Sequence, residues 1–147
     1  MKKQTDPRMH SAEHILNQTM VRKYDCGRCF SAHIERKKSK CDYHFDHLLT
    51  DAEIADIQST VNNIIDSDLP VTISLFSKDE AERLFNTEKL PESVTDDVRI
   101  VHIGDYDACP CIGEHVASTG EIGKFRITTT SFEDGILRIR FKLSRSS

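Results

Sequence analysis

Two histidines near the start of the chain have the spacing of metal ligands. The run His10-Ser-Ala-Glu-His14 places two imidazoles four residues apart. Residues at this spacing share one face of a helix, so both rings can bind one ion. The alternative is a pair of partly buried histidines that form hydrogen bonds with the backbone.

A second pair with the same spacing lies far downstream, where Cys111-Ile-Gly-Glu-His115 adds a thiolate and an imidazole. Zinc accepts mixed sulfur and nitrogen ligands in tetrahedral geometry, whereas magnesium and calcium require oxygen ligands. The two pairs together therefore predict one zinc ion per chain, bound by His10, His14, Cys111 and His115.

Two other kinds of metal site would use some of the same residues. The pattern His-x-x-Glu-His is also that of inverzincin peptidases, in which the glutamate polarises a zinc-bound water. Those enzymes are longer chains and take a distant carboxylate as the third ligand. A four-thiolate structural zinc is the other alternative, and it would make the protein a binding module. Its ligands would be Cys26, Cys29, Cys109 and Cys111.

A helix over residues 8–24 is predicted to carry the first histidine pair. Asp6 offers a capping side chain, and Pro7 suits the first helical position. The helix has two stripes, which imply burial on more than one side. One stripe contains Met9, Ala12, Leu16 and Met20, and the other contains His10, His14, Asn17 and Val21. We expect Gly27 to provide a left-handed cap after the helix.

The remaining elements predict one α+β domain over residues 1–147 with a mainly antiparallel sheet. A capping box of Thr50 and Glu53 begins a second helix that runs toward Pro70. Ser77 begins a short third helix that ends near Phe85, and 86–97 is expected to be loop. Strands are expected at 29–35, 41–45, 71–76 and 98–103, followed by a turn entering a short helix or loop at 109–116 and a hairpin of 125–130 with 136–143.

Composition narrows the class of protein. With 147 residues, of which 37% are hydrophobic, the chain suffices for one buried core. No apolar run approaches the roughly 20 residues of a membrane span, and no apolar signal segment follows the first lysines. The odd number of cysteines, five, argues against a disulfide framework. We therefore expect a cytoplasmic protein with no membrane partner.

The net charge of −4 conceals basic segments that could bind phosphates. Residues 51–110 contain 4 Lys and Arg against 14 Asp and Glu, whereas residues 1–50 contain 10 against 6. A basic cluster in the first segment could contact a nucleic acid, although such a cluster can equally be a solvated turn. Its members are Arg36, Lys37, Lys38 and Lys40.

The motifs resemble the editing domain of alanyl-tRNA synthetase and its freestanding AlaX relatives of the short type. Residues 111–127 read Cys-Ile-Gly-Glu-His-Val-Ala-Ser-Thr-Gly-Glu-Ile-Gly-Lys-Phe-Arg-Ile. That family typically has Cys-Gly-Gly-Thr-His-Val, then Thr-Gly-Glu-Ile-Gly and an aromatic strand. Phe30-Ser31 and residues 41–45 stand where the family has a Gly-Ser step and an Arg-Phe-Asp-Phe strand. Threonyl-tRNA synthetase editing domains share both ligand pairs, but residues 119–123 favour the alanyl branch.

The resemblance implies a sheet wrapped around the histidine helix, and zinc-dependent hydrolysis in trans of the aminoacyl ester of mischarged tRNA. The expected substrates are alanine tRNAs charged with serine or glycine. A threonyl-type hydrolase acting on serine-charged threonine tRNA, and a zinc module that binds tRNA without catalysis, are the alternatives. The zinc would activate a water or orient the substrate, and a cognate synthetase is a possible partner.

The resemblance also suggests which residues contact the substrate near the metal. The candidates are Ser31, His33 and Asp107. Two departures from the family lie beside them: Arg28 stands in place of a glutamine, and Phe30 replaces the glycine. We expect these two residues to change the lining of the substrate pocket, with Phe30 limiting its size.

Overall fold

The computed structural model describes residues 6–84 and 97–144. In chain order the elements are α1 (Pro7–Tyr24), β1 (Ser31–Ile34), β2 (Ser39–His44), α2 (Asp51–Asp66), β3 (Val71–Phe76), α3 (Lys78–Leu84), β4 (Val98–Ile103), β5 (Asp107–Pro110), the 3₁₀ turn η1 (Thr119–Glu121), β6 (Lys124–Glu133) and β7 (Ile136–Ser144).

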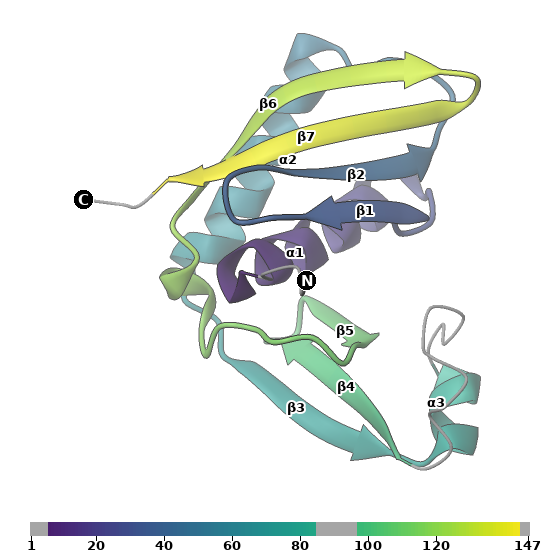
Figure 1. The fold of residues 1–147 in the computed structure, drawn as a ribbon, viewed down its shortest axis with the longest axis vertical. Helices are drawn as coiled ribbons and strands as arrows, with labels where there is room; N and C mark the ends of the chain where they lie inside the picture. Colours follow the sequence, from purple (N-terminus) through teal and green to yellow (C-terminus); the bar gives the residue numbers. More distant parts are fainter. Residues whose placement is uncertain (1–5, 85–96, 145–147) are drawn as a thin grey trace, which may run out of the picture.

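The strands form two antiparallel sheets on either side of α1. The larger sheet has the order β1-β2-β7-β6, and the smaller one has the order β3-β4-β5. Figure 1 shows α1 between them, with α2 packed behind the larger sheet. The predicted α+β class and the antiparallel pairing are therefore confirmed, but the strands form two sheets where one was expected.

Helix α1 begins and ends with local signals in the sequence. The side chain of Asp6 accepts a hydrogen bond from the Arg8 amide, and Pro7 occupies the first turn. The helix ends at Asp25, whose φ of 52° is left-handed. The expected cap at Gly27 is therefore wrong, because Asp25, a residue type that tolerates this conformation, already caps the helix two residues earlier.

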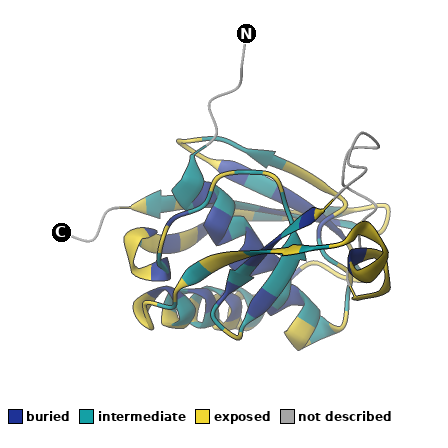
Figure 2. Cartoon of the chain, turned by 90° about the horizontal axis from the view of Figure 1, so that it is seen from below, coloured by how far each residue is buried: buried dark blue, intermediate teal, exposed yellow. Residues whose placement is uncertain are grey.

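The inner face of the larger sheet packs against α1 and α2. Because side chains alternate along a strand, Cys41 and Tyr43 on β2 point inward with Leu137, Ile139 and Phe141 on β7. They share one core with apolar residues of both helices. Figure 2 shows buried residues, in dark blue, interspersed with intermediate and exposed ones along the helices and strands. The residues between these inward positions on each strand face outward.

Two other predictions differ from the structure or fall outside it. Residues 107–110 form the short strand β5, paired with β4, where the sequence predicted only a turn entering a short helix or loop from 109. A four-residue strand containing a proline has too little alternation to be recognised. The loop expected at 86–97 lies outside the described residues except for Asp97. No helix in the described ranges is long and apolar enough to span a membrane.

Candidate metal centre

The four predicted ligands meet in the structure. His10 and His14 lie on α1, while Cys111 and His115 lie on the segment between β5 and η1. One potential ligand atom from each residue lies within 4.8 Å of all the others. The ring centroids of His10 and His115 are 4.2 Å apart, and that of His14 is 4.5 Å from His115. The sequence pattern thus predicted a real spatial cluster.

The donor atoms of this cluster fit zinc. Nε2 of His10 lies 3.4 Å from Sγ of Cys111. Zinc binds nitrogen and sulfur at about 2.0–2.3 Å, so donors separated by this distance can share one ion. Three imidazoles and one thiolate are ligands that zinc accepts in tetrahedral geometry, and they provide no oxygen for magnesium or calcium.

Each imidazole also has a partner on its outer side. Nδ1 of His10 donates to the Glu114 carbonyl at 3.2 Å, and Nδ1 of His115 lies 3.0 Å from Oγ of Ser11. Nδ1 of His14 lies 3.5 Å from Oδ2 of Asp107, an ion-pair contact that does not have hydrogen-bond geometry. An outer acceptor fixes the tautomer of a zinc-bound histidine, because it keeps the proton on Nδ1 and leaves Nε2 for the ion, as the Glu114 carbonyl does for His10.

His115 provides the clearest sign that an ion belongs here. Its Nε2 is buried and has no hydrogen-bond partner among the described residues. An unpaired buried nitrogen is costly unless something binds it. Burial, helped by the neighbouring His14 and His10, lowers the pKa of His115 to about 2. The ring is therefore neutral at physiological pH, as metal binding requires.

A buried network holds His14 from behind. Asp107 is 4% exposed, and its oxygens accept hydrogen bonds from Arg28 at 2.8 and 3.3 Å and from Gln18 at 3.1 Å. Burial raises the pKa of Asp107, but His14 and Arg28 outweigh it and the net shift is downward. Asp107 is therefore ionised. Burial lowers the pKa of His14, yet the Asp107 carboxylate and Cys111 raise it overall.

The segment that carries Cys111 is anchored to the smaller sheet. Arg99 on β4 donates to the carbonyls of Cys111 and Gly113 at 2.9 and 2.7 Å, and the Cys111 amide donates back to the Arg99 carbonyl. The Gly113 amide lies 3.4 Å from Sγ of Cys111, where it can donate to a thiolate. These contacts position the thiolate opposite the imidazoles of α1.

Glu13 lies beside the cluster. From the sequence alone, this residue had a role only in the peptidase alternative. Its Oε1 lies 3.6 Å from Nε2 of His10, and Oε2 accepts from Nδ2 of Asn17 at 3.4 Å. The other side of this carboxylate faces the buried thiols Cys29 and Cys41. A hydrogen bond with Cys29, together with burial, raises the pKa of Cys41 well above its usual value. Glu13, Cys29 and Cys41 are thus a second group whose possible ligand atoms lie within 4.8 Å of one another.

The other candidate residues are distributed over two places. Asp107 lies behind His14, as described above. Ser31 and His33 lie on β1 opposite Asp42 and Lys40, on the outer face of the larger sheet, and neither belongs to the four-ligand cluster. The four cysteines of the alternative structural site do not form a group among the described residues, because Cys29 lies beside Cys41 instead.

The basic residues proposed for phosphate binding follow β1 directly. Arg36, Lys37 and Lys38 are exposed in the β1–β2 connection, and Lys40 lies on β2. Phe30 is 40% exposed, and its ring stacks on that of His44 with centroids 4.1 Å apart. Arg28 faces Asp107, so it supports the histidine cluster from behind.

Comparisons with known proteins find similar sequences among aminoacyl-tRNA synthetases. The family model described as "Threonyl and Alanyl tRNA synthetase second additional domain" matches residues 98–140, which include Cys111 and His115. The chain is 35% identical over 143 residues to an alanine–tRNA ligase of Cenarchaeum symbiosum, covering 91% of this chain and 15% of the ligase. A second alanine–tRNA ligase, from Methanopyrus kandleri, is 31% identical over 138 residues, with coverages of 91% and 15%.

A smaller relative carries the editing function in its name. The alanyl-tRNA editing protein AlaX-L of Pyrococcus horikoshii is 34% identical over 119 residues, which are 81% of this chain and 29% of that protein. The chain therefore spans less than a third of the length of each of these relatives.

Proposed function

Because this chain is an AlaX-like domain related to alanyl-tRNA synthetases, we propose that it hydrolyses the aminoacyl ester of wrongly charged tRNA in trans, with zinc bound by His10, His14, Cys111 and His115. The observation that carries the proposal is the convergence of three imidazoles and one thiolate, each imidazole with an outer partner, in a chain of this family. Residues 1–147 would act as one domain in the cytoplasm.

The substrates we propose are alanine tRNAs carrying serine or glycine, in keeping with the alanine–tRNA ligases and the AlaX-L protein to which the chain is similar. Their ester links the amino acid to a ribose hydroxyl at the 3′ end. Hydrolysis needs a water positioned at the carbonyl carbon, a proton acceptor, and stabilisation of the tetrahedral oxyanion.

The residues of the cluster fit a positioning role for the ion. When bound, zinc supplies a positive charge that can orient the amino or carbonyl group of the substrate. Four protein ligands fill a tetrahedral shell, which favours this orienting role over activation of a water. Ser11, Asp107 and the Glu114 carbonyl would keep the three rings in the required tautomers.

Glu13 is the best-placed proton acceptor. Its carboxylate borders the cluster at His10 and is partly buried, so it can receive a proton from the attacking water. The water oxygen then bonds to the carbonyl carbon, the carbon–oxygen ester bond breaks, and the proton passes to the ribose oxygen that leaves. Asn17 donates to the same carboxylate and holds it in place.

The test is release of free amino acid from charged tRNAs. Wild-type protein should deacylate serine- or glycine-charged alanine tRNA and spare alanine-charged tRNA. The Glu13→Gln variant should keep its zinc and lose about 10²- to 10⁴-fold in rate, because a positioned base contributes a factor of this size.

Glu114→Ala is the matched control for removal of a carboxylate. Glu114 neighbours His115 but contributes only its backbone carbonyl to the cluster. It should leave the rate within a few-fold of wild type. Release from serine-charged threonine tRNA alone would identify the threonyl-type alternative. Binding of tRNA with no release from any charged tRNA would contradict the proposed hydrolase and favour the non-catalytic module.

A further inference from the structure

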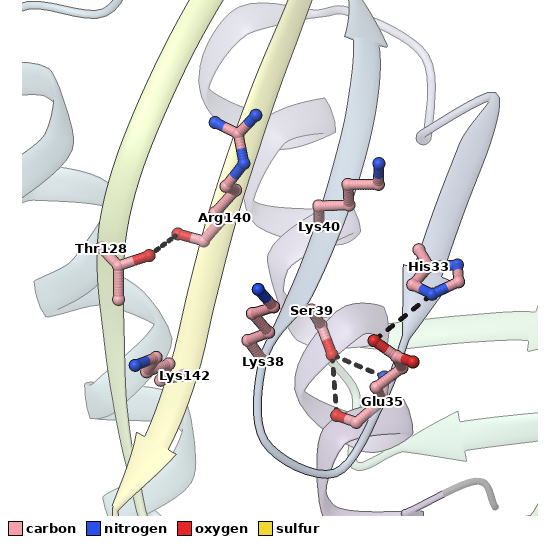
Figure 3. Close-up of a pocket in the computed structure, with 8 residues that line it drawn as sticks. All are labelled: His33, Glu35, Lys38, Ser39, Lys40, Thr128, Arg140 and Lys142. Carbon is pink, nitrogen blue, oxygen red and sulfur yellow. Dashed lines mark hydrogen bonds and ion pairs between the residues drawn. The ribbon is translucent and has the colours of Figure 1, made fainter.

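A cationic pocket of about 310 Å³ lies on the larger sheet, away from the histidine cluster. Its basic lining residues come from β2 and β7 and from the connection that precedes β2. Figure 3 shows these strands side by side, with Thr128 of β6 at one edge and His33 of β1 at the other. The basic residues of the pocket are Lys38, Lys40, Arg140 and Lys142.

Strand alternation places this pocket on the outer face of the sheet. Cys41 and Ile139 point into the core, so their neighbours Lys40 and Arg140 point the opposite way. Lys40 pairs directly with Arg140 across β2 and β7, and with His33 across β1 and β2. Three basic side chains therefore lie in one row across three strands.

Lys40 and Arg140 in this row are like charges on directly opposite residues. Like charges directly opposite each other destabilise a sheet. Two residues along the same strands, Arg138 faces Asp42 and binds it through two hydrogen bonds of 2.7 and 2.9 Å. Arg138 is the main cause of the lowered pKa of Asp42, to which Lys40 and Arg140 contribute less.

The pocket is lined by more basic than acidic side chains. Glu35 is the acidic residue that lines it, and Oε2 of Glu35 forms an ion pair with Nε2 of His33 at 3.3 Å. Within residues 6–84 and 97–144, no ion pair joins Lys38, Lys40, Arg140 or Lys142 to a carboxylate. An external anion is therefore the natural partner of this row.

A hydrogen bond and the strand β1 link the residues of the pocket to the candidate metal centre. Ser39, at its floor, donates to the sulfur of Met9, the residue before His10. Strand β1, which contributes His33, begins just after Cys29 and Phe30, and Cys29 contacts Glu13. A chain of nucleotides that crosses the outer face at β1 would thus meet the exposed Phe30 on its way to the cluster.

We propose that this pocket binds backbone phosphates of the tRNA near its acceptor end, with Lys40 and Arg140 as the central contacts. The inference rests on the proposed function, because it takes the charged tRNA as the occupant. A polyanion fits better than one small anion, since the basic residues extend over two strands and continue into the exposed Arg36 and Lys37. The Phe30–His44 stack, at the other end of β1 and β2, offers a flat ring for an unpaired base.

The test compares the double variant Lys40→Gln/Arg140→Gln with wild type in binding uncharged alanine tRNA over a series of salt concentrations. Loss of two phosphate contacts should reduce the slope of log affinity against log salt by about 1.4–1.8. The melting temperature should stay equal or rise, because the variant removes a repulsive pair. A structural role for the two residues would lower it instead.

The matched control is Lys78→Gln/Arg83→Gln, which removes two exposed charges from α3 beside the smaller sheet. It should leave the slope unchanged. A second variant, Lys38→Gln/Lys142→Gln, removes the other two basic residues of the pocket and should reproduce the reduced slope. An unchanged slope in both pocket variants would overturn the inference.

Hydrolysis of a minimal aminoacyl ester separates this inference from the proposed function. The pocket variants should hydrolyse it at the wild-type rate, because the ester carries no tRNA backbone. If wild-type protein fails to hydrolyse any ester, the proposed activity is wrong, while the salt slopes still decide whether the pocket binds RNA.

Discussion

At the scale of single residues, the three imidazoles of the cluster are held by three different partners. His10 uses a backbone carbonyl, His115 uses the hydroxyl of Ser11, and His14 uses the carboxylate of Asp107. Only Asp107 carries charge, and it is itself fixed by Arg28. A carboxylate behind a histidine increases the basicity of that ligand, so we expect Asp107 to contribute most to metal affinity.

Changing Asp107 to asparagine should therefore weaken zinc binding. Loss of a partner of this kind typically costs about 10- to 100-fold in metal affinity. The affinity can be measured by competition with a chromophoric chelator, which does not depend on catalysis. Asp105→Asn is the matched control, because Asp105 is exposed two residues away. Equal affinities for the two variants would mean that Asp107 serves the fold alone.

The sequence predicted the ligands of the cluster but not their surroundings. His10 and His14 were found because helical spacing is a local property, and Cys111 with His115 repeats that spacing. The partnership of Arg28 with Asp107 joins residues 79 positions apart, and no local pattern encodes such a contact. The same holds for Lys40, whose neighbour Arg140 comes from a strand at the other end of the chain.

At the scale of elements, the segment after β5 decides whether the two ligand pairs meet. It has little regular structure, so its position depends on Arg99 and on close packing against α1. Gly113 lies against the His10 ring so tightly that a Cβ there would fall within 3.0 Å of two ring atoms. Glycine is needed at this position for space rather than for a special backbone conformation.

Gly113→Ala should therefore displace the His10 ring and weaken zinc binding more than it weakens the fold. The measurements are zinc affinity by chelator competition, together with the melting temperature of the zinc-free protein. Gly27→Ala is a suitable control, because nothing lies within 4 Å of a Cβ at that position. Unchanged affinity in Gly113→Ala would show that the segment can shift to accommodate the methyl group.

The predicted elements agree with the structure where the sequence signal is local. They differ from it where a strand forms only by pairing with another strand. The capping box of Thr50 and Glu53 begins α2 as expected, and Asp134 with Gly135 forms the hairpin turn between β6 and β7 with positive φ angles. Strand β5 exists because β4 pairs with it. Its own four residues carry no strand signal, so the sequence alone could not predict it.

At the scale of the whole molecule, the candidate metal centre joins the beginning of the chain to the segment that follows the smaller sheet. His10 and Cys111 are 101 positions apart, and the larger sheet contacts α1 on its other side. An ion bound to all four ligands would therefore connect the two sheets through α1. Since such a site exists only in the folded chain, binding energy adds to folding stability.

Removal of zinc should consequently lower the melting temperature of the whole protein. At a free zinc concentration about 100 times the dissociation constant, binding contributes about 2.7 kcal/mol, which corresponds to about 5–10 °C for a chain of this size. The experiment compares melting with zinc and with a chelator, alongside metal analysis, which should give about one zinc per chain.

His10→Ala/His14→Ala should contain no zinc, and its melting temperature should not respond to the chelator. Cys26→Ala/Cys29→Ala should keep both the zinc and the response, even if loss of the buried Cys29 side chain lowers its melting temperature overall. The opposite pattern, with zinc retained in the histidine variant and lost in the cysteine variant, would place the ion among thiolates and remove the histidine cluster as the metal centre.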